Sequence, residues 1–408
     1  MLEEKYIDLL LNKCLSFKKS KSLFINYNEL TYDFALKLKD YANKLGIDDV
    51  YLCCDNSYKK RDVLRTISKE DIKNNSLFDN SIWDEYAKKN ASFLLIDSEI
   101  PHLMDGISED LIVEAMRVSR TTKPIYKEKQ MRNEIPWCIC AYPNKLWACD
   151  LFRDMDEDEA FKKLFGLICD ICMVNDNTSA IKNWDEFFKF QIETTNKLNN
   201  MHIHKLHYRN SLGTDLTIEL NDRALWTSCA NDKDMIANMP SYEIFTTPDY
   251  RKTNGIVYSS KPLIYNGTII DKFYLEFKDG RCINSCALVG DKVLKNIINT
   301  DSYSSYLGEV ALVNYNSLIS NTKLVFNTTL FDENASCHLA LGNGFSECIK
   351  NGNSMSNDEL KEQGVNLSNA HVDFMVGTDD LQILGVLNDG KTVPIFENGN
   401  FTLQFKEQ

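Results

Sequence analysis

Two segments in the second half of the chain carry histidines beside acidic residues. The 408-residue sequence has only six histidines, and one of them, His338, lies in the segment 330–342. The second segment contains His371 and Asp373, two residues apart. On an extended strand both side chains project from the same face, and imidazole and carboxylate groups are common ligands of divalent metals. Together they predict the nucleus of a metal site. Taken alone, His338 is also typical of a buried core histidine, and His371 with Asp373 is also typical of a solvated strand end.

Two glutamates further upstream lie in apolar surroundings. Glu243 lies in a segment bounded by prolines, and Glu309 opens the apolar stretch 309–313. Burial of a carboxylate is unfavourable unless the group is paired or coordinated, so each glutamate is typical either of a salt-bridged strand end or of a cation ligand. The candidate set becomes Glu243, Glu309, His338, His371 and Asp373. Such a set exceeds the needs of one closed tetrahedral site and suits two divalent ions that share a bridging carboxylate, roughly 3.5–4 Å apart.

The first half of the chain alternates strands and helices. The apolar stretch 22–27 predicts a strand, apolar residues at helical spacing predict a helix over 32–45, and 49–54 predicts the next strand. The same alternation continues to residue 141. Strand–helix–strand units imply a parallel sheet. Residues 1–200 are therefore predicted to form an α/β N-terminal domain with a parallel sheet.

Two segments at which cofactors commonly bind do not support a cofactor site here. The first strand-to-helix turn, residues 26–30, has no glycine. This excludes a Rossmann dinucleotide site, because pyrophosphate requires a close approach of the backbone there. Cys169 and Cys172 have a redox or zinc spacing, but they lie in an amphipathic helix predicted over 156–173, and no second cysteine pair at zinc-finger spacing follows. They are interpreted as buried packing residues.

The second half of the chain is built mainly from strands. A helix predicted over 184–200 ends at the domain junction, and the run 201–207 contains three histidines but no carboxylate. This run is interpreted as a junction segment with solvated histidines. Alternating stretches such as 214–220 predict strands, and a later one ends in an Asp-Gly turn. Residues 201–408 are therefore predicted to form an α+β, sheet-based C-terminal domain that binds the metals and carries out catalysis.

The composition excludes several classes of partner. The net charge is −13, whereas nucleic acids and anionic membranes require clustered Lys and Arg, so neither is an expected partner. The first five residues lack the apolar core of a secretory signal, and no run reaches the length of about 18 apolar residues that a membrane helix needs. The 13 cysteines are an odd number and lie mainly among apolar residues. They are interpreted as reduced, buried side chains of a cytoplasmic protein.

Four motifs carry a resemblance to a known family. They are Pro240-x-x-Glu243-x-Phe245-Thr246-x-Pro248, Gly308-Glu309-Val310-Ala311-Leu312-Val313, Leu330-Phe331-Asp332-Glu333-Asn334-Ala335-x-x-His338-x-Ala340-Leu341-Gly342 and His371-Val372-Asp373-Phe374-Met375. In these motifs, and over essentially its whole length, the chain resembles the thermophilic metalloprotease family of aminopeptidases, of the aminopeptidase T, aminopeptidase S and PepS type.

The resemblance implies a function and a set of roles. Carried over residue by residue, it makes Glu243, Glu309, His338, His371 and Asp373 the metal ligands and gives Glu309 a catalytic role as well. It also implies two divalent metal ions (zinc, cobalt, or magnesium or manganese), a two-domain protomer, and a homodimer that encloses an internal cavity. The implied substrates are peptides with a free N-terminus, from which the N-terminal residue is removed.

One position departs from the family pattern. Family members commonly have a catalytic tyrosine seven residues after the first histidine, where this chain has Phe345. A phenyl ring cannot donate a hydrogen bond to a developing oxyanion, and loss of one such donor costs roughly 10²–10³ in rate. Three explanations compete. In the first, another hydroxyl group replaces that of the missing tyrosine, with Tyr242, Tyr303 and Tyr306 as candidates. In the second, the metals alone stabilise the oxyanion. In the third, the enzyme is slow or altered.

The expected mechanism is two-metal hydrolysis. Metal binding lowers the pKa of water towards neutrality, and Glu309 transfers a proton to the leaving amine. Asp332 and Glu333 are candidates for partners that orient His338. Two alternatives belong to other classes. One is a metal-binding homologue without catalytic activity, and the other is a dimetal hydrolase of a non-peptide amide.

Overall fold

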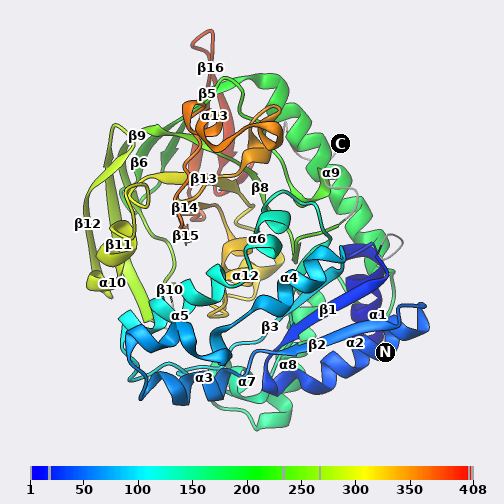
Figure 1. The fold of residues 1–408 in the computed structure, drawn as a ribbon. Coiled ribbons are helices and arrows are strands. Elements are labelled where there is room, and N and C mark those ends of the chain that lie inside the picture. Colours follow the sequence, from blue (N-terminus) through cyan, green and yellow to red (C-terminus); the bar gives the residue numbers. More distant parts are fainter. Residues whose placement is uncertain (1, 17–19, 232–234, 266–267, 403–404, 406–408) are drawn as a thin grey trace. The chain divides into compact units, whose positions relative to one another are not determined.

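The computed structural model describes residues 2–16, 20–231, 235–265, 268–402 and 405 (Figure 1). The chain forms two compact units, Met1–Trp184 with Asp232–Pro240, and Asp185–Asn231 with Ser241–Gln408. This division differs from the predicted boundary at 200/201, because it falls inside helix α9 (Ala180–Met201). A continuous helix gives no sequence signal at the residue where its tertiary contacts change. None of the described helices is long and apolar enough to cross a membrane.

A parallel sheet forms the centre of the first unit. Its strand order is β2 (Asp49–Cys54), β1 (Ser22–Tyr27), β3 (Ser92–Asp97), β4 (Trp137–Ala141) and β7 (Asn238–Met239). All neighbouring strands are parallel, which confirms the α/β prediction. The last strand comes from the distant segment 232–240. Its two residues are too short a strand to be recognised from any periodicity.

The helices of this unit are α1 (Leu2–Asp8), α2 (Tyr32–Lys44), α3 (Ser57–Leu64), α4 (Ser81–Lys88), α5 (Glu109–Thr121), α6 (Pro124–Met131), α7 (Lys145–Leu151) and α8 (Glu157–Ile171). The helices predicted over 32–45 and 156–173 correspond to α2 and α8. The rings of Phe24 on β1 and Phe93 on β3 pack against each other and against Trp83 on α4, all of them buried. Aromatic burial of this kind fixes the helix to the sheet.

Side chains link the carboxyl ends of three strands of this sheet. Asn28, just after β1, donates a hydrogen bond of 2.7 Å to the carbonyl of Ser98, which follows β3. Asn144, after β4, donates to the Ser98 hydroxyl at 2.9 Å. Open α/β sheets bind ligands at the carboxyl ends of the strands where the strand order reverses. Here the side chains at that edge are engaged with one another.

The cysteines are free thiols. Cys169 and Cys172 are both buried, Cys169 within helix α8 and Cys172 at its end, as predicted for packing residues. Cys286 differs from the prediction of burial, because it lies exposed on strand β12. Its position alternates with that of the buried Ala287, so the strand has one solvated face.

The second unit contains a large antiparallel sheet. The strand order is β10 (Leu263–Tyr265), β11 (Thr268–Lys278), β9 (Pro248–Tyr258), β6 (Asp215–Leu220), β5 (Ile203–Arg209), β16 (Gln382–Leu387), β17 (Thr392–Glu397) and β18 (Asn400–Phe401), and β12 (Arg281–Val289) pairs with β11. The predicted turn between β11 and β12 is confirmed. Asp279 and Gly280 have φ values of 49° and 81°, the positive pair that a tight hairpin turn requires.

A smaller antiparallel sheet of four strands carries the candidate site. Its order is β15 (His371–Met375), β14 (His338–Gly342), β13 (Leu307–Leu312) and β8 (Ile244–Thr246). One face of this sheet supplies Val310, Leu339 and Phe374 to the core that the large sheet also lines. The second unit therefore combines helices with antiparallel sheets, as predicted for an α+β domain.

Candidate metal centre

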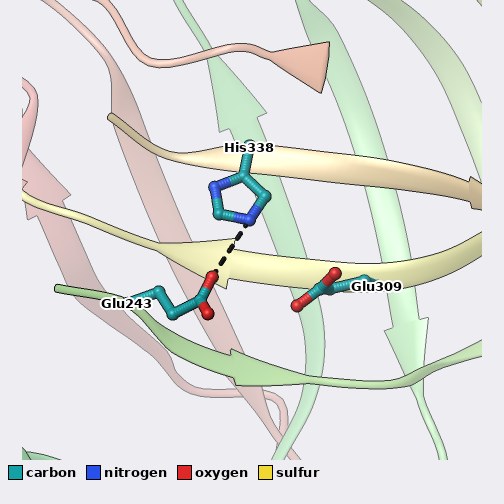
Figure 2. A group of neighbouring side chains, drawn as sticks. All are labelled: Glu243, Glu309 and His338. Carbon is teal, nitrogen blue, oxygen red and sulfur yellow. Dashed lines mark ion pairs between the residues drawn. The ribbon is translucent and has the colours of Figure 1, made fainter. Parts of the chain in front are cut away.

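The small sheet brings all five predicted ligands together. His371 and Asp373 lie on β15, His338 begins β14, Glu309 lies on β13, and Glu243 immediately precedes β8. Figure 2 shows Glu243, Glu309 and His338 reaching from neighbouring strands into a common space. Four of these residues are buried, and the side chain of His371 is 30% exposed. The site is thus enclosed by protein and open at His371.

Strand register explains the convergence. Ala340 on β14 pairs with Glu309 on one side and with Asp373 on the other. Gly342, two residues later, pairs with His371. Paired residues on adjacent antiparallel strands share a face of the sheet, and residues two apart on one strand do the same. The central strand thus presents a methyl group and a glycine where its neighbours present acid and imidazole groups, which leaves space between them.

A register shift on β13 also shapes the site. The pairing with β14 slips between Leu307 and Glu309, and the residue between them is Gly308. A Cβ atom at Gly308 would lie 2.1 Å from the carbonyl oxygen of Gly342. Only glycine permits this close approach of the two strands. The Gly-Glu pair of the sequence motif therefore places the carboxylate at an irregularity of the strand.

Two groups of potential ligand atoms share one carboxylate. Glu243, Glu309 and His338 form the first group, and Glu309, His371 and Asp373 form the second. Within each group, ligand atoms lie within 4.8 Å of one another. His338 Nε2 lies 3.2 Å from Glu243 Oε2 (Figure 2). His371 Nε2 lies 3.2 Å from both Glu309 Oε2 and Asp373 Oδ1.

Backbone carbonyls orient both imidazole rings. His371 Nδ1 lies 2.8 Å from the carbonyl oxygen of Asn343, and His338 Nδ1 lies 3.4 Å from that of Ser336. A carbonyl oxygen only accepts, so each Nδ1 carries a hydrogen and each Nε2 faces the carboxylates. Metal-binding histidines are commonly held in this way by a partner of the second nitrogen. The Nε2 atoms are satisfied either by a proton or by a cation placed among the carboxylates.

The polar side-chain atoms of the cluster fit divalent cations. Asp373 Oδ1 is buried, and its close polar neighbour among the described residues is His371 Nε2 at 3.2 Å, a contact without hydrogen-bond geometry. A buried carboxylate oxygen without a donor is unfavourable unless it interacts with a cation. The oxygen and nitrogen ligands, without any thiolate, suit hard or borderline ions such as magnesium, manganese, cobalt or zinc.

Burial and mutual charge shift the pKa values of the cluster. Burial raises the pKa of Glu309 to about 7. Burial by itself would lower the pKa of His338, but the hydrogen bond and charge of Glu243, together with other carboxylates, raise it to about 10. Burial would raise the pKa of Asp373, yet the adjacent His371 holds it at about 2. Bound cations would favour the deprotonated form of every one of these groups.

The two acidic residues before His338 have different surroundings. The carboxylate of Asp332 accepts a hydrogen bond of 3.0 Å from the N–H of Phe326 and further ones from Asn327 and Thr328. It organises this loop, so it does not orient His338 as predicted. Glu333 begins the short helix η7 (Glu333–Ala335), and its carboxyl group lies in the field of Asp373, Glu243 and His338.

The tyrosines proposed to replace the family hydroxyl all make aromatic contacts. Tyr242 meets the ring of Phe187 edge-on at 5.4 Å, and Tyr303 and Tyr306 both contact the ring of Tyr250. These ring contacts account for their positions without reference to the metal ligands. Whether any of them acts in catalysis remains a prediction.

Three residues that support the site were not predicted. Gln191 on α9 donates hydrogen bonds to the carbonyls of Ser241 and Glu243 at 3.2 and 3.1 Å. Asn334 accepts a hydrogen bond of 2.8 Å from the N–H of Tyr242. Asn343 contributes only its carbonyl, to His371. The contact of Asn343 uses its backbone carbonyl, so its residue type gives no signal. Gln191 lies within a helix, where a glutamine is usually solvated. Asn334 lies in a motif that the sequence analysis identified, so it could have been found.

The histidine-rich run after α9 is not part of this site. His204 lies 3.7 Å from Glu219, and His207 lies 2.6 Å from Asp215, both partners being on β6. The prediction of solvated histidines missed these cross-strand carboxylates, because they are distant in sequence from the run. Among the described residues, the clusters suited to a metal ion lie only in the small sheet.

The fold and this centre belong to a known class of protein. Residues 2–401 match the thermophilic metalloprotease (M29) family, and the chain therefore belongs to that family. It is 38% identical to aminopeptidase AmpS of Bacillus subtilis (strain 168) over 78% of each chain, and 33% identical to aminopeptidase 2 of Geobacillus stearothermophilus over 98% of each chain. The solved structure of wild-type AmpT from Thermus thermophilus matches 98% of this chain and 99% of its own, with a TM-score of 0.89 at 25% identity.

Proposed function

We propose that this protein is a metal-dependent aminopeptidase that removes N-terminal residues from peptides. The observation that carries the proposal is the pair of ligand groups that share Glu309. Membership of the metalloprotease family and the aminopeptidases among its relatives support the same reaction. The ligands in this proposal are Glu243, Glu309, His338, His371 and Asp373, which would hold two divalent ions with Glu309 between them.

The chain's own residues would carry the proton transfers. When bound, two divalent ions supply Lewis acidity and make water nucleophilic near neutral pH. Glu309, the carboxylate common to both ligand groups, is proposed to take a proton from the attacking water and return it to the leaving amine. Asn343 and Ser336 hold the imidazoles of His371 and His338 with Nε2 facing inward. The buried walls around His338 and Glu309 limit access of bulk water.

Removal of metal tests this proposal directly. The purified protein, loaded with cobalt or zinc, is expected to hydrolyse leucine p-nitroanilide, to lose this activity after chelation and dialysis, and to regain it when metal is restored. Metal content is measured on the same samples, and two ions per chain are expected. Hydrolysis that survives complete removal of metal would rule the mechanism out.

Two other outcomes would favour the alternatives. Stoichiometric metal with no hydrolysis across a panel of peptides would indicate a metal-binding homologue without activity. Hydrolysis of non-peptide amides in preference to peptides would indicate a different dimetal hydrolase. The finer assignments belong to this proposal too: a cytoplasmic location, supported by free cysteines, and a homodimer, tested by light scattering of the purified chain.

A further inference from the structure

Two buried amide side chains lie at opposite ends of the small sheet, each beside one of the two ligand groups. They belong to Asn366 and Gln191, and both residues have an exposed fraction of 0%. Their hydrogen bonds to the segments that carry the ligands are made with backbone groups. Burial of an amide is unfavourable unless its polar atoms are bonded, so the segments that these bonds hold indicate what each amide does.

Asn366 joins the segments that flank three strands. Its side-chain amide donates to the carbonyls of Tyr303 and Tyr306 at 3.0 and 3.1 Å, just before β13. Its Oδ1 accepts a hydrogen bond of 3.0 Å from the N–H of Ser368, shortly before β15. Its backbone carbonyl accepts one of 2.8 Å from the N–H of Gly344, shortly after β14. The start of β13, the end of β14 and the start of β15 are therefore held by one residue.

The same end of the sheet carries His371. This histidine pairs with Gly342, the last residue of β14. The N–H of Asn343 donates to the carbonyl of Ala370 at 2.7 Å, and the carbonyl of Asn343 lies 2.8 Å from His371 Nδ1. The direction of the imidazole thus depends on where Asn343 lies relative to β15, and Asn366 bonds to the chain on both sides of this contact.

Gln191 holds the opposite end of the sheet. It donates to the carbonyls of Ser241 and Glu243 at 3.2 and 3.1 Å, just before β8. The first residue of β8 pairs with the last residue of β13, and His338 begins β14 at this same end. The Oε1 atom of Gln191 is buried without a hydrogen-bond partner among the described residues. The bonds that fix this amide are therefore those that its Nε2 donates to the segment of Glu243.

We infer that Asn366 and Gln191 are positioning residues, each of which sets the affinity of one cation position and leaves the other nearly unchanged. The first supports the ligand group that contains His371, and the second supports the group that contains His338. Glu309, which both groups share, lies between these ends. This inference rests on the proposed function, which takes both groups as cation positions. Groups that orient metal ligands from outside typically contribute about 10- to 100-fold to metal affinity.

The test measures the affinity of one position at a time. His338→Ala leaves one ligand group intact and His371→Ala leaves the other, and Asn366→Leu or Gln191→Met is added to each. In the His338→Ala background, we expect Asn366→Leu to raise the Kd for cobalt by about 10- to 100-fold and Gln191→Met to leave it nearly unchanged. In the His371→Ala background, the two effects should be exchanged. Calorimetric titration of the purified full chain with cobalt gives each Kd.

Each substitution is the matched control for the other, because both replace a fully buried amide by an apolar side chain of similar size. Weakening of both positions to the same extent would show that the amides only stabilise the fold and would overturn the inference, as would unchanged affinities. Where Asn366→Leu does not fold, Ser368→Ala tests the same end, since the Ser368 hydroxyl accepts the N–H of Ala370 at 3.0 Å and donates to Asp301 at 2.8 Å. Failure of the proposed function is distinct, because wild-type protein would then bind fewer than two ions or hydrolyse no peptide before any amide is changed.

Discussion

The ring of Phe345 meets the imidazole of His371 edge-on, with 5.3 Å between ring centroids and an angle of 61° between the planes. The same phenyl ring lies 5.3 Å from that of Phe245, and its backbone N–H donates to Thr247 Oγ1 at 2.8 Å. The side chain that departs from the family pattern therefore contacts a predicted metal ligand. Its backbone is fixed, so a tyrosine at this position would occupy nearly the same place.

Phe345→Tyr should accelerate hydrolysis. The substitution adds one hydroxyl group beside His371, and a donor to the developing oxyanion is worth roughly 10²–10³ in rate when it is removed from an optimised site. We expect part of this effect, a gain of about tenfold in kcat for leucine p-nitroanilide. Steady-state kinetics of the cobalt-loaded protein measures it. Phe345→Leu controls for packing without a hydroxyl, and an unchanged kcat in the tyrosine variant would show that this chain stabilises the oxyanion by other means.

Glu309→Gln should abolish turnover while the chain still folds. Glu309 is the residue common to both ligand groups and the proposed proton carrier, and glutamine has the same shape but cannot accept the proton from water. A fall in kcat of at least about 10³-fold is expected, with thermal unfolding retained as one cooperative transition. The exposed Glu362 supplies the control, because Glu362→Gln changes the same chemical group away from the site. Turnover at the wild-type rate would remove Glu309 from catalysis.

The convergence of the ligands was predictable where short-range geometry decides it. His371 and Asp373 share a face because strands alternate, and Glu309 opens the register irregularity that Gly308 permits. By contrast, the pairing of β14 with both β13 and β15 depends on contacts that are distant in sequence. The sequence motifs identified residues whose side chains are suited to bind metal. Only the strand pairing shows that Ala340 lies between Glu309 and Asp373.

The loop function of Asp332 could not be predicted for a related reason. The sequence around Asp332 is the same whether its carboxylate points towards a metal site or accepts hydrogen bonds from neighbouring N–H groups. Here the N–H groups of residues 326–328, which precede Asp332 in the chain, donate hydrogen bonds to its carboxylate. The return of residues 238–239 to the parallel sheet was similarly hidden, because so short a strand has no periodicity.

Asp332→Ala should destabilise the second unit. The substitution removes the acceptor of the Phe326 N–H, in a residue that is only 5% exposed, and leaves buried donors unsatisfied. The free energy of unfolding should fall by about 1–3 kcal/mol, measured by urea denaturation of metal-free protein. Asp332→Asn keeps one acceptor oxygen and should lose less. Equal stability of the alanine variant and the wild type would contradict the role of Asp332 in holding this loop.

Metal uptake at pH 7 should release protons. In metal-free protein the pKa of His338 is about 10 and that of His371 lies well above its usual range, so both rings are charged at pH 7, although a ligand imidazole must be neutral. Their raised pKa values mean that the stability they contribute is fully present below pH 6.5 and is lost as the pH rises through 10. Metal-free protein should therefore unfold at lower temperature at pH 9 than at pH 6.5, whereas metal affinity should rise over this range. Calorimetric titration with cobalt in buffers of different ionisation enthalpy should give a release of about two to three protons per chain, from the two imidazoles and in part from Glu309, whose pKa is about 7. His338→Asn should release about one proton fewer, while His207→Asn, outside the site, should behave as the wild type. Metal binding without proton release would show that the two imidazoles do not become ligands.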